Sequence, residues 1–522
     1  MGPMKCHYCG VDHADELVRC PECGRDRVPA NSETVPPTRV VPGTGFNRDA
    51  TRYLCAALQM NASLNHQAHK KILKAHYRTI ASSPGVDLVT VLKYGAAARS
   101  RQMIRDVVLV ALLVIGLVLL ASPESEWVLL ALFAGWAVLL VETLSTQYGV
   151  LAKRLRRDVF DPAHAPAPGS GAIRARLDAI ELQNRGNVTV SAQYGPFSGY
   201  GDSFGNWSFT LNVAKPAEGC ADVIDFTTGE LRDHIADAVR EIGLPGLVVE
   251  DRVFVSGLDL LHGLDPAVKR AVLPNELAAP AARVDEDVIA RMREDATSRA
   301  RPYLVIRVGG WSGDLVVTLF LRFSLLPRGD QLHVEANYSL LRPIHDRYQQ
   351  VDRLLDAPTP LQLARATRSC LLRFVPVTFG AVTRLSSVVL APLEDVLGRM
   401  REARAIKHGR SFNYGAEICL RELAAEKWYH RYFQALDKEM YSKVVERRVV
   451  DALEEFLDEH DIDTRDLRER QTTILNNGVY VSGQGSLTAG SLAVGTNPIA
   501  KVVSRAGSTF TRPRSAPAGR GK

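Results

Sequence analysis

Two uncharged apolar runs, at residues 107–122 and 127–141, constrain the fold of this chain more than any other feature. They consist almost entirely of Leu, Val, Ala, Ile and Phe and have no polar face. Each run is shorter than the roughly 20 residues of a usual spanning helix, so a buried helical hairpin in a soluble domain is the alternative to a membrane hairpin. The missing polar face favours the membrane, because a helix packed on a soluble core keeps one polar side.

Basic residues flank this hairpin on one side only. They precede the first run and follow the second, whereas the joining sequence SPESE contains acids and no Lys or Arg. These basic residues are Arg99, Arg101, Arg105, Lys153, Arg154, Arg156 and Arg157. Short loops rich in Lys and Arg stay in the cytoplasm. The pattern predicts a two-pass protein of the cytoplasmic membrane, with residues 104–145 as a hairpin in the lipid bilayer and both termini cytoplasmic.

Four cysteines near the start of the chain are spaced as in a zinc ribbon. Cys6, Cys9, Cys20 and Cys23 form two Cys-x-x-Cys pairs, and a glycine follows each pair. Two such turns direct four thiolates at one tetrahedral ion and leave no open position for catalysis. We therefore expect residues 1–28 to bind a structural Zn²⁺. The alternative, a redox pair, lacks its usual βαβ neighbourhood.

The charge of the chain argues against nucleic acid as a partner. Its 64 Lys and Arg against 58 Asp and Glu give a net charge of +6, which is mild for 522 residues. The expected ribbon is near neutral as well, so a protein-contact or purely structural role suits it better than DNA binding. Three histidines before the hairpin, His66, His69 and His76, lack a carboxylate that would complete a metal site, and we expect them on a solvated helix face.

The remainder of the chain predicts an α+β body followed by helices. Period-two alternation marks strands within residues 173–345, and adjacent strands between 303 and 341 suggest an antiparallel meander. Residues 346–468 are expected to be helical. The other expected segments are a linker at 29–50, a helical juxtamembrane region at 51–103, a basic juxtamembrane segment and linker at 146–172, a Gly-punctuated β segment at 469–503 and a basic disordered tail at 504–522.

An apolar stretch at residues 374–393 has the hydropathy of a third span. Arg384 in its middle, with Pro376 and Pro392, argues against that assignment. We expect a buried helix here, and a helix lying on the membrane surface is the alternative.

A loop at residues 194–206 is rich in glycine and aromatic residues. It lacks the Gly-x-x-x-x-Gly-Lys-Ser/Thr pattern of a phosphate-binding loop. Gly-Asp-Ser at 201–203 matches the nucleophile block of some lipases, in which Ser203 would need a partner such as His234. Three common residue types make a weak match, so we expect a structural glycine loop and assign no catalytic residue.

The C-terminal β segment brings short apolar pulses separated by glycines, for example Gly483 and Gly490. Each pulse is too short to form a stable sheet alone, but stacked copies would bury both faces. The segment therefore predicts a protein partner or a homo-oligomer formed through the tail. A disordered linker is the alternative.

Several phrases also resemble a known group of proteins. YGPFSGYGDSFGNWSFTLNVAKP, LVVEDRVFVSG and ERQTTILNNGVYVSG resemble uncharacterised two-pass membrane proteins of high-GC actinomycetes that carry an N-terminal zinc ribbon. The resemblance covers most of the chain from about residue 50 and implies residence in the cytoplasmic membrane. It supplies no activity and no catalytic residue.

Together these modules predict a membrane-anchored cytoplasmic scaffold or signalling protein that acts through protein–protein contacts and self-assembly. A non-enzymatic role is favoured because no catalytic constellation stands out. One alternative is a membrane-perturbing effector, for example in phage defence, that clustering triggers. The other is a hydrolase with its site near residues 194–234.

Overall fold

The computed structural model describes residues 4–5, 12–13, 48–121, 125–169, 171–409 and 411–476. The chain divides into two compact units, Met1–Gly45 and Phe46–Lys522. In the first unit, the short strands β1 (Met4–Lys5) and β2 (Asp12–His13) pair antiparallel, with Met4 opposite His13. The other described elements belong to the second unit.

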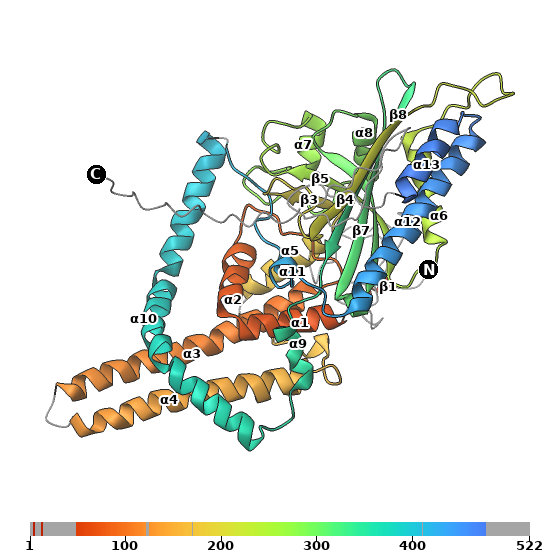
Figure 1. Cartoon of the computed structure of the whole chain (residues 1–522). Coiled ribbons are helices and arrows are strands. Elements are labelled where there is room, and N and C mark those ends of the chain that lie inside the picture. Colours follow the sequence, from red (N-terminus) through yellow and green to blue (C-terminus); the bar gives the residue numbers. More distant parts are fainter. Residues whose placement is uncertain are drawn as a thin grey trace, which may run out of the picture. The chain divides into compact units, whose positions relative to one another are not determined.

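A helical layer precedes the sheet in the sequence and contains the apolar hairpin (Figure 1). Its members are α1 (Arg48–Met60), α2 (Ala62–Ala68), the π-helix η1 (His69–Leu73), α3 (Leu88–Leu120), the turn η2 (Ser125–Trp127), α4 (Val128–Leu144), the π-helix η3 (Ser145–Leu155), the turn η4 (Pro162–His164) and α5 (Gly171–Arg185). Asp87 caps α3 by accepting a hydrogen bond from the Thr90 N–H. The first half of α3 is buried beside α1, through residues such as Val91 and Leu92, whereas its second half is exposed. One continuous helix therefore leads from the core into the hairpin.

The body is built on a six-stranded sheet with the order β3-β5-β6-β7-β8-β4. The strands are β3 (Val188–Ser191), β4 (Asp202–Asn212), β5 (Leu247–Ser256), β6 (Arg301–Gly310), β7 (Leu315–Leu325) and β8 (Gln331–Leu341). β3 and β5 are parallel, and every other neighbouring pair is antiparallel. The expected antiparallel meander between residues 303 and 341 is confirmed as β6, β7 and β8.

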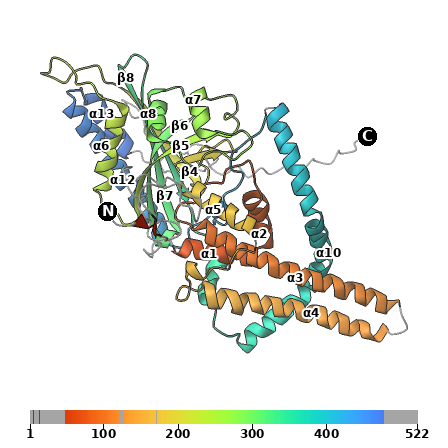
Figure 2. The ribbon, with the colours of Figure 1, turned by 180° about the vertical axis from the view of Figure 1, so that it is seen from behind.

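The helices that pack on the sheet come partly from between the strands in the sequence and partly from after the last strand. α6 (Thr228–Arg240), α12 (Tyr432–Glu459) and α13 (Arg465–Asn476) lie along one face (Figures 1 and 2), where Leu231, Val449 and Leu453 join the core. α7 (Pro266–Val272) and α8 (Glu286–Glu294) pack near β3 and β5. The remaining elements are the turn η5 (Trp311–Gly313), α9 (Asp346–Gln349), the turn η6 (Gln350–Arg353), α10 (Pro360–Arg404), the π-helix η7 (Ala405–Gly409) and α11 (Leu420–Leu423).

The structure confirms a mixed α+β fold with a sheet and many helices, and its described residues include three apolar helices, one more than the expected hairpin contains. One expectation is wrong in part: residues 469–476 are helical, as the end of α13, and not part of a β segment. Ion pairs explain the helix, because Arg470 pairs with Asp466 one turn away and Arg468 pairs with Asp458 of α12. Residues 477–522, and with them the rest of the expected tail, lie outside the described residues.

Candidate membrane-embedded site

The hairpin of α3 and α4 presents apolar side chains that nothing in the described chain covers. The two helices run side by side (Figures 1 and 2), and Val118, Leu129 and Phe133 are 63%, 74% and 61% exposed. Leaving such side chains in water costs about 1.5–3 kcal/mol each relative to burial. Within the part of the chain that the structure describes, three helices are long and apolar enough to cross a membrane, namely Leu88–Leu120, Val128–Leu155 and Pro360–His408.

The third of these helices corrects the expectation of a buried helix at residues 374–393. α10 begins in a capping box formed by Thr359 and Gln362, and it contains Pro376 and Pro392 in its interior. Leu372 and Val389 are each 71% exposed, so the segment is not a core helix. The expectation of burial was wrong because apolar composition does not show which segments cover a helix, and on α10 apolar side chains such as Leu372 and Val389 remain exposed.

The first half of α10 follows α4 in the opposite direction. The Tyr148 hydroxyl donates to Gln362 Oε1 (3.2 Å), and Cys370 Sγ lies 3.5 Å from Thr143 Oγ1. Farther along, the ring of Phe374 rests against Gly135, where an added Cβ would lie 3.0 Å from Phe374 Cε2. Glycine at position 135 therefore permits the closest approach of the two helices.

Four charged side chains join the three helices at the base of the hairpin. Asp106 of α3 is almost fully buried, and its carboxylate accepts hydrogen bonds from Arg384 Nε of α10 (2.7 Å) and Arg105 Nη2 (2.8 Å). Arg105 Nη1 also lies 3.5 Å from Glu142 Oε2 of α4. Two cations and two anions cancel within this cluster, so the base carries no net charge from these groups. Gly380 makes room for the Arg384 guanidinium, since a Cβ there would lie 2.7 Å from Arg384 Nη1.

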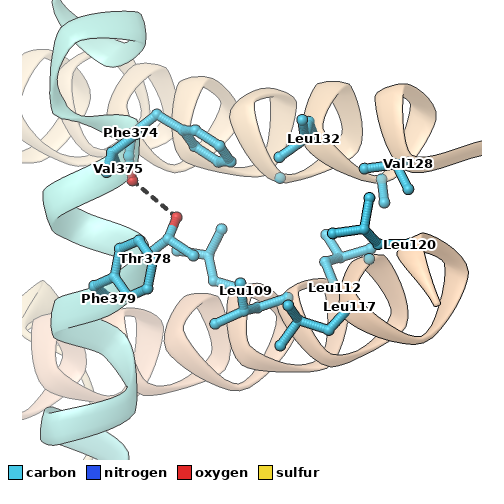
Figure 3. Close-up of a pocket in the computed structure, with 14 residues that line it drawn as sticks. Leu109, Leu112, Leu117, Leu120, Val128, Leu132, Phe374, Val375, Thr378 and Phe379 are labelled. Carbon is cyan, nitrogen blue, oxygen red and sulfur yellow. Dashed lines mark hydrogen bonds between the residues drawn. The ribbon is translucent and has the colours of Figure 1, made fainter. Parts of the chain in front are cut away.

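An apolar crevice of about 210 Å³ lies between the hairpin and α10 (Figure 3). Its walls come from Leu109 and Leu117 of α3, Leu132 of α4, and Phe374 and Phe379 of α10. The single hydroxyl in the lining, that of Thr378, donates to the Phe374 carbonyl (2.8 Å) and is thereby satisfied within α10. The crevice thus suits hydrocarbon and offers no polar group for chemistry.

A buried arginine ties the return end of the hairpin to the body. Arg52 of α1 is 1% exposed and donates to the Leu155 carbonyl at the end of η3 (3.1 Å). The same guanidinium donates to Asp49 (2.6 Å) and to Asp352 of η6 (2.9 Å). A buried charge is tolerated only with such partners, so removing either carboxylate would leave a costly unpaired cation. The hairpin is therefore fixed to the body at both of its ends.

The expected zinc ligands Cys6, Cys9, Cys20 and Cys23 lie outside the described residues. Strands β1 and β2 flank Cys6 and Cys9 in the sequence. Among the residues that the structure does describe, no group of three or more His, Cys, Asp or Glu side chains gathers as a metal site. Near the hairpin, burial and the neighbouring cations Arg99 and Lys74 lower the pKa of His69 to about 4.

The structure does not bring Ser203 and His234 together. Ser203 pairs with Ser339 near the start of β4, whereas the His234 ring packs against Phe456 of α12. The Phe456 end of α12 lies near the other end of β4, where Pro216 forms a bridge with Ile462. The two side chains therefore lie towards opposite ends of β4 and not beside one another.

The glycine loop binds a carboxylate of its own chain. Gly199 and Gly201 adopt φ of +98° and +88°, and their N–H groups donate to the same Glu422 carboxylate oxygen (2.8 and 3.0 Å). Burial raises the pKa of Glu422, which the two hydrogen bonds oppose. Sequence reasoning missed this partner, since Glu422 is distant in the sequence and carries no motif.

Sequence reasoning also missed the Asp106–Arg384 pair. The available signal was an acid at the start of one apolar run and an arginine inside another, which can neutralise each other across two helices. Hydropathy is assessed one segment at a time. The charge of Arg384 therefore counted against membrane contact, without the acid on α3 that neutralises it.

Comparison with curated proteins finds no significant match, and comparison with solved structures finds none either. A protein-family model, described as the AbeC-like domain, matches residues 206–490. The match includes α10 and most of the sheet, while the hairpin precedes it in the sequence. Since it spans more than half of the 522 residues, the chain belongs to the AbeC-like domain family.

Proposed function

We propose that this protein is a membrane-anchored scaffold that holds its α+β body at a cytoplasmic membrane surface and acts through protein–protein contacts. One observation carries the proposal: the apolar hairpin is built into the core of the body. α3 passes unbroken from buried to exposed surroundings, and Arg52 fixes the returning end at Leu155. A hairpin attached in this way holds the body in one orientation, which suits the presentation of a binding surface.

The positive-inside pattern supports a two-pass arrangement in which residues 104–145 span the bilayer and both termini are cytoplasmic. We propose in addition that Cys6, Cys9, Cys20 and Cys23 hold one structural Zn²⁺, which would fold a segment too short to bury a core. The Gly-punctuated tail would supply self-association or a partner contact, because its apolar pulses are too short to fold alone.

Self-association is tested by native mass measurement of the full-length protein in detergent. The comparison is a chain truncated after Arg470, which keeps the Asp466–Arg470 pair of α13. The scaffold proposal expects a large homo-oligomer for the full-length chain and a smaller species for the truncated one. Monomers in both samples would remove the assembly role of the tail.

A second candidate, a membrane-perturbing effector that clustering triggers, is favoured by the exposed apolar side chains of α10 beside the hairpin. Forced clustering of the full-length protein through a fused inducible dimeriser separates the two. If the protein is a membrane-perturbing effector, clustering should cause growth arrest with loss of membrane potential. If it is a scaffold, clustering should cause neither. The separation of Ser203 from His234 gives no support to the hydrolase alternative.

A further inference from the structure

α10 combines two opposite faces along its second half. Leu390, Leu393 and Leu397 are all exposed, and at about 100° per residue they lie on one side of the helix. Arg384, Asp395 and Glu402 are spaced by 11 and 7 residues and lie on the other side. The first half continues the apolar side through Leu372 and Val375. α10 is thus amphipathic, although its hydropathy alone is that of a spanning helix.

The polar face of α10 is paired with groups on the base side of the hairpin. Arg384 binds Asp106, Asp395 pairs with Lys74 next to η1, and Glu402 Oε1 lies 3.7 Å from Arg78 Nε. Lys74 and Arg78 lie in the connection between η1 and α3 and not in the hairpin arms. The second half of α10 therefore follows the surface of the body and does not extend towards the tip of the hairpin.

The first half begins on that same side. Gln362 contacts Tyr148, which lies beyond Glu142 at the base, and Phe374 reaches only as deep as Gly135 and Leu109. Figure 1 shows that α10 then bends and crosses the hairpin, and Figure 2 shows the same crossing from behind. Pro376 lies between the two halves, and a proline inside a helix favours such a bend. Both ends of α10 are consequently on the side of the hairpin base.

We propose that α10 is an in-plane helix that dips into one leaflet, with its exposed apolar face among the lipid chains of the leaflet that contains the hairpin base. This inference rests on the proposed two-pass anchoring. The occupant is lipid, because the apolar face of α10 is continuous with the hairpin through the shared crevice of Figure 3. Arg365, Arg368 and Arg373 are exposed along the first half, where guanidinium groups reach phosphate headgroups.

Sidedness is tested with single cysteines in the full-length protein, in sealed membrane vesicles treated with a membrane-impermeant maleimide. The positions are Arg365→Cys and Arg401→Cys, on either side of the apolar face, and Glu126→Cys at the hairpin tip; all three side chains are exposed. The unsubstituted chain supplies the background from its native cysteines. We expect positions 365 and 401 to react from one face of the membrane and position 126 from the other.

Each other outcome overturns a different statement. Reaction of positions 365 and 401 from opposite faces would make α10 a third span and overturn the in-plane helix. Reaction of position 126 from the same face as position 365 would show that the hairpin does not cross, which removes the two-pass anchoring itself.

Lipid contact is tested with spin labels at two neighbouring exposed positions, Leu393→Cys on the apolar face and Glu394→Cys beside it, in liposomes. We expect the label at 393 to collide mainly with oxygen, which concentrates in lipid, and the label at 394 mainly with a water-soluble nickel complex. Equal water exposure of both labels would place α10 off the membrane and overturn the proposal even if the hairpin spans.

Discussion

Two glycines and one glutamate show how single residues hold this fold together. Gly199 and Gly201 take left-handed backbone conformations and approach other backbone segments closely, so their N–H groups can converge on Glu422. The sequence indicates glycine dependence here, but it cannot indicate the acceptor, which arrives from a helix more than two hundred residues later. Local conformation was thus predictable, and its tertiary partner was not.

Replacing Gly201 by alanine should lower the free energy of unfolding by about 3 kcal/mol or more, because a Cβ would lie 2.1 Å from the Leu340 carbonyl oxygen at a φ that alanine rarely adopts. Thermal unfolding in detergent measures the change. Gly195→Ala is the matched control, since its Cβ would meet nothing within 4 Å. Equal losses in both variants would contradict a specific role for position 201.

The low pKa of His69 predicts a pH dependence of stability. Its folded pKa of about 4 lies below the ordinary 6.5, so the unfolded chain binds more protons between these values and stability falls as the pH drops from about 6.5 to 4. The fall is at most about 3.4 kcal/mol, at 1.36 kcal/mol per pKa unit. Besides Arg99 and Lys74, His66 faces the ring and Asp395 of α10 opposes them.

Unfolding midpoints of the wild type and His69→Gln across pH 4–7 check this expectation, because the difference between the two curves removes the contributions of other groups. The variant should lose less stability on acidification than the wild type. His262→Gln, at an exposed histidine, serves as the control. Parallel curves for wild type and His69→Gln would count against the prediction.

At the scale of helices and strands, the sequence predicted features that depend on nearby residues and did not predict features that depend on tertiary contacts. Alternation identified β6, β7 and β8, whereas the core of α12 had to be seen in the structure, where Val449, Leu453 and Phe456 are buried and Val444 is exposed. The exposure of α10 was not predicted because the burial of an apolar helix depends on which other segments pack against it. An apolar segment of this length is equally compatible with a core, a bilayer and an interface, and the pairing of Arg384 with Asp106 favours the last.

The packing of α10 on α4 predicts a specific disulfide. Thr143→Cys should cross-link to the native Cys370 on mild oxidation, since Cys370 Sγ lies 3.5 Å from Thr143 Oγ1. Peptide mass spectrometry with and without reductant detects the link. Val141→Cys, which is exposed on the other side of α4, should not form it. Cross-linking of Val141→Cys as readily as Thr143→Cys would mean that the two helices are not packed as described.

At the scale of the molecule, two units follow one another, and the second gathers distant segments into one body. Residues of β4, α6, β6, β7 and β8 share one hydrophobic cluster with residues of α12 and α13, so this part of the sheet and the later helices form one core. The sequence analysis assigned these segments to an α+β domain and a separate helical region, because sequence patterns do not show which helix packs on which face of the sheet. The boundary between the two units lies between Gly45 and Phe46.

The division of the chain into two units leads to a test of the zinc proposal. Deleting residues 1–45 should leave the unfolding temperature of residues 46–522 unchanged within about 2 °C, a shift below 1 kcal/mol, while removing one bound zinc per chain. Elemental analysis and thermal unfolding measure the two effects. Cys20→Ser in the full-length chain is the matched variant that alters only an expected ligand. Zinc retained after the deletion would contradict the assignment.

The short arms of the hairpin have a consequence for where the protein can reside. Residues 107–120 of α3 rise only about 21 Å at 1.5 Å per residue, against a hydrocarbon thickness of roughly 30 Å. Such a hydrophobic mismatch is relieved when the bilayer thins locally or when anchors gather and share the thinned patch. The charge-neutral base, which can be drawn towards the hydrocarbon without carrying a net charge, favours the same outcome. Membrane thickness itself would then act as a sorting force that draws copies of this protein together.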